Sequence, residues 1–195
     1  FHVVATEWTL TDVALNMGGM HNIENMVAAI TVAKHLGIDD EKIRSAVGSF
    51  KGVKRRFEFI VKKDDRVFID DYAHHPDELR ALITGAKKMF TGKKCTVIFQ
   101  PHLFTRTRDF ADGFAESLDL ADELVLLPIY PARELPMPGV SSALIAERMT
   151  NKNVQLLEKS ELVTEMNKRK PDLLLMAGAG DIDTLVEPVK QALTH

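Results

Sequence analysis

The sequence is poor in cysteine, in net positive charge and in long apolar runs. Its single cysteine, Cys95, rules out an internal disulfide and fits a reducing compartment. Lysine and arginine number 25 against 28 aspartates and glutamates, a formal net charge of −3, so no overall positive field attracts nucleic acid. No apolar run approaches the ~20 residues that span a bilayer. We therefore expect a cytoplasmic protein that binds neither nucleic acid nor membranes.

A further absence concerns nucleotide binding. The phosphate-binding string GxxxxGK[ST] occurs nowhere, and its nearest approach, FTGKKC at 90–95, lacks the first glycine and the hydroxyl residue. If the protein uses a nucleoside triphosphate, the cradle for its phosphates is not in these residues. The chain also opens on Phe1 rather than methionine, and we expect it to be a piece of a longer protein.

The chain divides into two parts at a basic, glycine-bearing segment, KGVKRR. Before this segment, short strands are followed by an alanine-rich helix over 22–36 and a second helix whose N-cap is Asp39. After it, FEFIV and RVFID indicate a hairpin, and short apolar strands then alternate with helices. We therefore predict two domains, 1–51 and 52–195.

The alternation after the boundary predicts an α/β fold: a Rossmann-like, mostly parallel sheet with helices on both faces. Right-handed crossovers are expected between its parallel strands. Besides the hairpin, the expected strands are 95–100, 123–130, 153–158 and 172–178, and the expected helices are 76–90, 106–119, 142–150, 160–169 and 182–193.

The stretch DDYAHHP at 70–76 follows an apolar strand and leads into a helix that begins at a proline. It therefore lies on a strand-to-helix turn, at the edge where open α/β sheets bind ligands. One interpretation is helix capping by an acidic residue, which leaves Tyr72, His74 and His75 unexplained. In another, a carboxylate binds a ribose or orients a water on magnesium. Zinc is disfavoured because no partner cluster has ligand spacing.

Two stretches nearer the N-terminus allow similar pairs of interpretations. His21, Asn22 and Asn25 either cap a helix, with Asn22 as its N-cap, or hydrogen-bond a planar heterocycle such as adenine. Arg55 and Arg56 are either part of a solvated linker or contacts for phosphate, because a guanidinium pairs with two phosphate oxygens. The local sequence leaves both alternatives open.

FQPHLFTRTRDF places His102, Arg106 and Arg108 within a turn and a half past a strand end. Buried behind that strand end, these cations could bind a substrate carboxylate, whereas on an exposed helix they would bind nothing specific. MAGAGD at 176–181 holds only part of a dinucleotide fingerprint, so a simple strand-to-helix turn is favoured. The proline-rich loop at 131–140 leaves another strand end, where it could shape a ligand site.

In this order, the stretches GMHNIENMVAAITVA, GVKRRFE, DDYAHHPDE, QPHLFTRT and MAGAGDI resemble the Mur ligases, ATP-dependent amide-forming enzymes of peptidoglycan synthesis. The resemblance covers essentially the whole chain. It implies a parent of three domains. Residues 1–51 would be the helical remnant of the central ATP-binding domain, and residues 52–195 the C-terminal Rossmann-like domain that brings the amino acid. The main phosphate, magnesium and UDP-sugar sites would lie outside this chain.

In the chemistry that the resemblance implies, ATP with Mg²⁺ phosphorylates a substrate carboxylate, and an amine then attacks the acyl phosphate. QPHLFTRT and MAGAGDI point to the member of the family whose partners are UDP-N-acetylmuramate and L-alanine. On this basis His21, Asn22 and Asn25 would lie near adenine. Arg56 would meet the phosphates of ATP, and Asp71 would contact the ribose.

By the same resemblance, Tyr72, His74, His102 and Arg106 form the pocket for L-alanine, with His74 and Arg106 as catalytic residues. Many relatives have an arginine directly after the histidine of the PH motif, where this sequence has Leu103. Arg106 would then hold the amino-acid carboxylate alone. The chain by itself is expected to be inactive.

Two other functions stay open at this point. A murein peptide ligase that recycles a tripeptide shares a similar DxAHHP turn, although the TRTR stretch argues against it. A non-catalytic α/β domain that binds a nucleotide or a partner is the other alternative, and an upstream P-loop would discriminate against it. In every case the apolar helix face of Met26, Ala29, Ile30 and Ala33 needs a partner, which a second copy could supply in a homo-oligomer.

Overall fold

The computed structural model describes residues 1–194, apart from the side chain of His21. The chain forms two compact units, Phe1–Val53 and Lys54–His195, and each has its own hydrophobic core. Among the described residues, no helix is long and apolar enough to cross a membrane.

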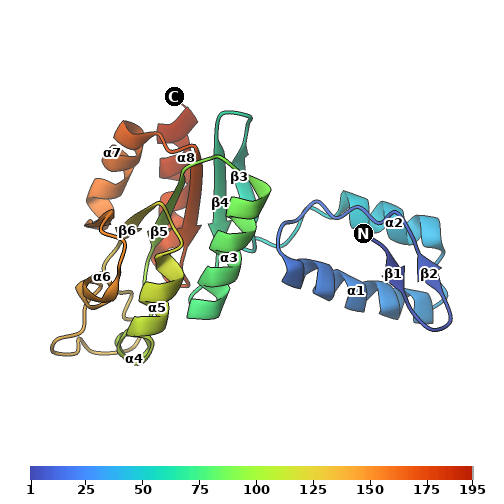
Figure 1. The fold of residues 1–195 in the computed structure, drawn as a ribbon, viewed down its shortest axis with the longest axis horizontal. Helices are drawn as coiled ribbons and strands as arrows, with labels where there is room; N and C mark the ends of the chain where they lie inside the picture. The colour runs from blue at the N-terminus through green and yellow to red at the C-terminus, as the bar shows by residue number, and fades with distance from the viewer. Residues whose placement is uncertain (195) are drawn as a thin grey trace. The chain divides into compact units, whose positions relative to one another are not determined.

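The first unit consists of a two-stranded antiparallel ribbon and two helices (Figure 1). Buried aliphatic side chains, among them Val3, Leu10, Ile30 and Ile43, come from all four elements and form one core. The elements are β1 (Val3–Val4), β2 (Thr9–Leu10), α1 (Met20–His35) and α2 (Asp40–Ser49).

The start of α2 was predicted correctly and the start of α1 was not. Asp39 is the N-cap of α2, and its Oδ1 accepts the N–H of Glu41 at 2.9 Å. Asn22 is not the N-cap of α1, because the helix already begins at Met20, after Gly19. The amide of Asn22 instead donates to the carbonyl of Gly18, at 2.6 Å. Its polar group is thus satisfied from inside the first turn.

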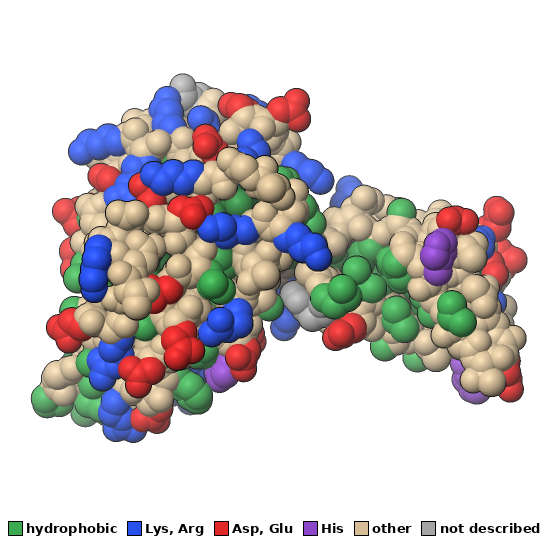
Figure 2. All heavy atoms as spheres, viewed as in Figure 1, with side chains coloured by type: hydrophobic (Ala, Val, Ile, Leu, Met, Phe, Trp, Pro, Cys, Tyr) green, Lys and Arg blue, Asp and Glu red, His purple; other side chains and the backbone are tan. Residues whose placement is uncertain are grey.

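An apolar groove of about 390 Å³ lies between α1 and α2. Figure 2 shows the green apolar side chains that gather there. The helix face predicted to need a partner, Met26, Ala29, Ile30 and Ala33, lines this groove together with residues of α2 such as Ile43 and Val47.

The second unit contains a six-stranded sheet in the order β3-β4-β8-β5-β6-β7. The predicted hairpin is present as an antiparallel pair, and the other four strands all run parallel to β4. The strands are β3 (Glu58–Lys62), β4 (Val67–Asp71), β5 (Cys95–Phe99), β6 (Glu123–Leu126), β7 (Val154–Leu156) and β8 (Leu173–Ala177). The predicted fold, a mostly parallel Rossmann-like sheet, is confirmed.

Helices cover both faces of this sheet, and each face has its own core (Figure 1). Residues of α3, α5 and α6 pack on one face, and residues of α7 and α8 on the other. Neighbouring residues of β5 alternate between the two cores: Phe99 faces the first and Ile98 the second. The helices are α3 (Pro76–Met89), α4 (Phe104–Asp109), α5 (Ala111–Leu118), α6 (Ala143–Arg148), α7 (Lys159–Arg169) and α8 (Val186–Thr194), with a 3₁₀ turn η1 (Asp181–Leu185).

Three predicted elements differ from those observed. The helix expected over 106–119 is divided into α4 and α5 at Phe110, whose φ of −115° and ψ of 17° leave the α-helical region. The strand expected over 123–130 ends at Leu126, because Pro128 has no N–H to offer a neighbouring strand. The last helix begins as η1 before it becomes α8.

The strand order creates the crevice in which a ligand could bind. Although β8 is last in sequence, it lies between β4 and β5. The chain leaves β4 through α3 on one face, whereas it reaches β8 from α7 on the other. Connections that diverge to opposite faces open a crevice at the carboxyl ends of neighbouring strands. Three of the sequence stretches singled out above follow β4, β5 and β8.

Candidate functional site

The carboxyl ends of β4, β5 and β8 lie level with one another. Asp71 and Phe99 are both register partners of Ala177. The DDYAHH turn, the QPHLF segment and the glycine turn after β8 therefore meet at one edge of the sheet. The backbone N–H of Gly178 donates to the carbonyl of Asp71 at 3.3 Å and links two of these segments directly.

A row of aromatic rings runs along this edge. The ring centroids of Tyr72 and His74 lie 5.3 Å apart, and those of His74 and His102 lie 6.3 Å apart. His102 in turn stacks on Tyr130, at 5.7 Å with an interplanar angle of 21°. The structure thus brings Tyr72, His74 and His102 together, although 28 residues of sequence separate the two histidines.

His74 is held by its own turn. Its backbone N–H donates to the carboxylate of Glu78 at 2.8 Å, and its Nδ1 lies 3.2 Å from the same carboxylate and 2.9 Å from the carbonyl of Tyr72. Glu78 also accepts the N–H of His75 at 3.1 Å. His75 is the N-cap of α3, so the acidic residues of the turn do not cap this helix as one interpretation supposed.

Arg106 and His102 each carry a buried nitrogen without a hydrogen-bond partner among the described residues: Nη1 of Arg106 and Nδ1 of His102. Arg106 lies in α4, one turn past His102. Burial lowers the pKa of His102, and the nearby Arg106 and His74 lower it further, whereas Glu134 opposes them. The His102 imidazole is therefore neutral at pH 7, and a buried guanidinium nitrogen beside it is open to an acceptor.

Asp71 organises the turn through its carboxylate. Oδ2 accepts the backbone N–H of Phe57 at 2.7 Å, and Oδ1 accepts that of Ala73 at 2.8 Å. It thus joins the segment that enters the second unit to the end of β4.

The two arginines of KGVKRR lie in different environments. The guanidinium of Arg55 donates from Nε to Asp70 at 3.2 Å and from Nη2 to the carbonyl of Gly178 at 2.5 Å. Arg56 is exposed and has no ion pair with any residue of the described part. Both line a cavity of about 560 Å³, together with Tyr72 and Asp70.

Asp70 is the buried member of this group, with a side chain only 3% exposed. Burial raises its pKa to about 6, although the neighbouring Arg55 acts in the opposite direction. Its Oδ2 is paired with Arg55, while its Oδ1 is buried and has no partner among the residues that the structure describes.

The glycines of MAGAGD permit close packing. A Cβ on Gly178 would lie 2.8 Å from the carbonyl oxygen of Gln100, and one on Gly180 would lie 2.5 Å from Oε1 of the same residue. That Oε1 accepts the N–H of Ile182 at 3.0 Å, and Nε2 donates to Asp181 at 2.9 Å. The stretch is thus a tight strand-to-helix turn, as the favoured interpretation predicted.

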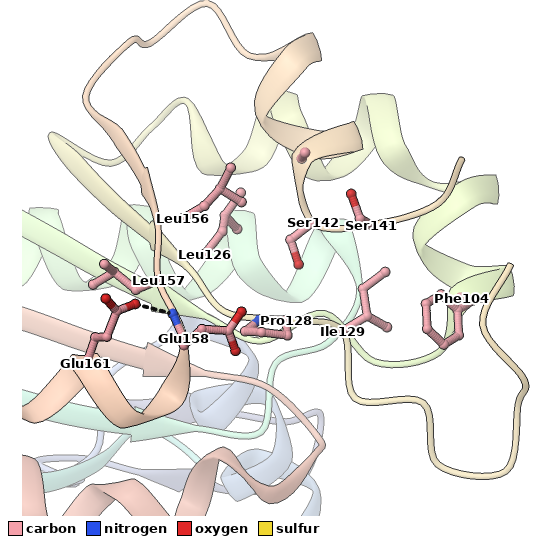
Figure 3. Close-up of a pocket in the computed structure, with 11 residues that line it drawn as sticks. Phe104, Leu126, Pro128, Ile129, Ser141, Ser142, Leu156, Leu157, Glu158 and Glu161 are labelled. Atoms are coloured by element: carbon pink, nitrogen blue, oxygen red, sulfur yellow. Dashed lines mark hydrogen bonds between the residues drawn. The ribbon is translucent and has the colours of Figure 1, made fainter. Parts of the chain in front are cut away.

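A second cavity, of about 450 Å³, lies beyond the carboxyl ends of β6 and β7 (Figure 3). Its wall includes Leu126 and Leu156, with Glu158 and Glu161 at the start of α7. The N–H of Glu158 donates to the carboxylate of Glu161 at 2.9 Å, the contact drawn in Figure 3. None of the site residues predicted from the sequence lines this cavity.

The remaining predicted residues belong to the first unit. Asn22 is buried and Asn25 is exposed, while the side chain of His21 lies outside the described part of the structure. Their predicted place near adenine stays a prediction.

No metal centre is evident in the described part: no group of three or more His, Cys, Asp or Glu side chains is arranged to hold an ion. The described residues do not by themselves fit a magnesium site.

No sequence pattern pointed to two further residues at this edge, Tyr130 and Glu134. Tyr130 directly precedes the proline-rich loop and Glu134 lies within it; this loop was expected to shape a ligand site. Tyr130 stacks on His102, and Glu134 accepts hydrogen bonds from Thr105.

The mostly parallel sheet with helices on both faces defines a domain of Rossmann-like type, and two histidines, a tyrosine and a half-buried arginine gather at its strand ends. The chain belongs to the Mur ligase family: the profile described as "Mur ligase, glutamate ligase domain" matches residues 55–180.

Relatives and solved structures agree with this assignment. The chain is 50% identical to the UDP-N-acetylmuramate–L-alanine ligase of Parabacteroides distasonis, over 99% of this chain and 42% of that protein. The crystal structure of the UDP-N-acetylmuramate–alanine ligase of Thermotoga maritima is 31% identical with a TM-score of 0.75, over 93% of this chain and 40% of that one. The chain therefore spans about two fifths of the length of these relatives.

A murein peptide ligase from Psychrobacter arcticus has the same fold at 24% identity. Its TM-score is 0.63, and the match covers 97% of this chain and 40% of that one.

Proposed function

We propose that this chain works as the C-terminal part of a cytoplasmic, ATP-dependent ligase that joins L-alanine to UDP-N-acetylmuramate in peptidoglycan synthesis. Residues 52–195 would present the amino acid, and residues 1–51 would belong to the central ATP-binding domain. The 50% identity to a relative with that name supports this choice of member over the murein peptide ligase, whose 24% identity supports the fold alone. The chain without the rest of the ligase would be inactive.

The observation that carries the proposal is Nη1 of Arg106 at the carboxyl edge of the sheet, which is buried and has no hydrogen-bond partner among the residues that the structure describes. A buried guanidinium nitrogen that lacks an acceptor leaves a desolvation cost that an arriving carboxylate removes. The guanidinium stays charged at every relevant pH and can hold both carboxylate oxygens. A free α-amino acid supplies that carboxylate, and its amine is left to react.

The imidazoles next to Arg106 suit the amine. The attacking amine must be neutral, and His102, whose pKa is lowered, is an unprotonated acceptor at pH 7. His74 lies beside it, with ring centroids 6.3 Å apart, and can orient the amine or accept its proton. Tyr72 would bound the side-chain pocket and favour a methyl group over larger side chains.

The nucleotide side of the proposal rests on other residues. Arg56 is exposed and free of ion pairs within the described part, so it can meet phosphate. Asp71 would contact the ribose. His21, Asn22 and Asn25 would lie near adenine in the assembled ligase. Mg²⁺ would be held by the remainder of the protein together with ATP.

The test is an assay of the full-length ligase with UDP-N-acetylmuramate and ATP, in which the amino acceptor is varied. We expect product with L-alanine and none with the intact tripeptide that a murein peptide ligase would take. Product with the tripeptide alone would assign the chain to the alternative enzyme. The absence of any ATP-dependent product would favour a binding domain without catalysis.

A further inference from the structure

The N-cap residue of α4, the helix that carries Arg106, provides no side-chain hydrogen bond to the helix. The N-cap of α4 is Leu103, at φ 71° and ψ 137°, and its side chain accepts no hydrogen bond. The first N–H groups of a helix need acceptors from outside the helix. Here the acceptor comes from Glu134 on the proline-rich loop. Its Oε2 accepts the N–H of Thr105 at 3.0 Å, and its Oε1 accepts the Thr105 hydroxyl at 2.5 Å.

The bonds of Glu134 continue a longer contact between two segments, 101–105 and 130–134. The N–H of Tyr130 donates to the carbonyl of Pro101 at 2.8 Å, and the N–H of Leu103 donates to the carbonyl of Tyr130 at 2.9 Å. The ring of Tyr130 stacks on His102 in the same stretch. The start of the loop therefore runs beside the segment that carries His102 and leads to Arg106.

The charge of Glu134 suits this place. A carboxylate at a helix N-terminus is stabilised by the helix dipole and by the N–H groups it accepts. Its titratable neighbour is His102, the residue whose pKa Glu134 raises. Glu134 is half-buried, whereas most of the loop around it is exposed.

We propose that Glu134 is a positioning residue for the amino-acid site: by capping α4 from the proline-rich loop, it fixes Arg106 and His102 where the substrate carboxylate and amine arrive. This inference rests on the proposed function for its substrate, but the geometry it assigns belongs to the chain itself. Glu134 would act through Thr105 and the helix, and it would not touch the amino acid.

The first test needs only the 195-residue chain. Glu134→Ala removes both hydrogen bonds, Glu134→Gln keeps an acceptor but loses the charge, and Thr105→Val removes only the hydroxyl bond. Glu147→Ala is the matched control, because Glu147 in α6 is exposed and has no ion pair in the described part. Titration of His102 by NMR and hydrogen exchange of the Thr105 amide are the readouts.

We expect the pKa of His102 to fall in both Glu134 variants, because the Glu134 carboxylate that raises it is removed while Arg106 and His74 remain. The Thr105 amide should exchange faster in Glu134→Ala, and Glu147→Ala should change neither quantity. An unchanged His102 pKa with an unchanged Thr105 amide in Glu134→Ala would overturn the proposal. If Glu134→Ala does not fold, the pKa of His102 in Glu134→Gln is the deciding measurement.

The second test uses the full-length ligase. Glu134→Ala should raise the KM for alanine about 10- to 100-fold, as expected when a binding group is displaced, and leave the KM for ATP unchanged. Glu134→Gln should restore part of the loss. An equal loss for both substrates would indicate general damage and contradict positioning. If the ligase shows no alanine-dependent activity at all, the proposed function fails, and the NMR test still decides the role of Glu134.

Discussion

The guanidinium of Arg55 lies over the ring of Tyr72, with its Cζ 5.1 Å from the ring centroid. The same group holds the carboxylate of Asp70 and the carbonyl of Gly178. One side chain thus joins the segment entering the second unit to the ends of β4 and β8. The arrangement places Tyr72 at the candidate site. Arg56, which follows Arg55 in the sequence, stays exposed.

Replacing Arg55 should destabilise the second unit. In Arg55→Ala the carboxylate of Asp70, 3% exposed, loses its charged partner, and a broken buried pair costs about 3–5 kcal/mol. Since Arg55 itself is partly exposed, we expect the lower end, about 3 kcal/mol. Hydrogen exchange of the β4 and β8 amides measures the second unit alone. Arg56→Ala is the control and should stay within about 0.5 kcal/mol; equal effects of the two substitutions would argue against the role of Arg55.

The pH dependence of stability should reveal the buried Asp70. Its pKa is about 6 in the folded chain and 3.8 when unfolded, so between these values the folded state binds more protons. Asp70 therefore contributes about 2–3 kcal/mol to the free energy of unfolding below pH 4. This contribution is lost as the pH rises through 6. Other carboxylates with lowered pKa values, such as Asp122 and Glu123, act in the opposite direction.

The Asp70 effect therefore has to be measured as a difference. The unfolding free energy of Asp70→Asn minus that of the parent chain should increase from pH 4 to pH 7, because asparagine has no charge to bury. A difference that stays flat over this range would show that Asp70 titrates normally.

Gly180 should tolerate no side chain. A Cβ there would lie 2.5 Å from Oε1 of Gln100 and 2.6 Å from the Cβ of Tyr130, so Gly180→Ala should cost about 1–3 kcal/mol through overpacking. It should also move Tyr130 and thereby shift the NMR signals of His102. Gly48→Ala in α2 is the control: its nearest contact is 4.0 Å away, and alanine there should stabilise the helix. A stable Gly180→Ala chain with unchanged His102 signals would contradict this.

Much of the fold and part of the candidate site followed from sequence pattern. Pro76 and the apolar strand before it were enough to place the DDYAHH turn at the carboxyl edge, where Tyr72 and His74 are found. Periodicity contains no information on strand order, however, so the position of β8 between β4 and β5 could not be predicted. It is this order that brings the glycine turn to Gln100.

The contributions of Tyr130 and Glu134 could not be predicted for a related reason. Glu134 caps a helix that begins 30 residues earlier, and capping rules consider only the residues adjacent to a helix start. At Asn22 the local sequence instead predicted a cap that the structure does not use. It is a good N-cap type with a helical pattern after it, but the helix starts at Met20, and its amide bonds Gly18 instead.

The chain alone should bind ATP weakly. The phosphate-cradle string is absent from its sequence, and such a cradle supplies much of the affinity for a triphosphate. Contacts from Arg56 and Asp71 would hold a nucleotide only loosely. Calorimetric titration of the 195-residue chain should therefore give a dissociation constant for ATP weaker than micromolar. An activity assay of the same chain should show no ligase activity. A micromolar or tighter constant would require a phosphate site within these residues.

The most direct test of the proposed amino-acid site compares two arginines of α4. Arg106 has a buried Nη1 without a partner in the described part, whereas Arg108 is exposed and pairs with its neighbour Asp109 at 2.7 Å. In the full-length ligase, Arg106→Ala should raise the KM for alanine about 30- to 1000-fold, because a charge-assisted pair to a small substrate contributes about 2–4 kcal/mol. The KM for ATP should hardly change. Arg106→Lys should retain part of the affinity for alanine, because lysine keeps the positive charge but cannot form a bidentate pair with the carboxylate. Arg108→Ala should behave like the parent enzyme in steady-state kinetics with each substrate varied.

An Arg106→Ala enzyme with unchanged KM and kcat for alanine would remove Arg106 from the site, and a selective loss in Arg108→Ala would move the carboxylate contact to the exposed side of α4.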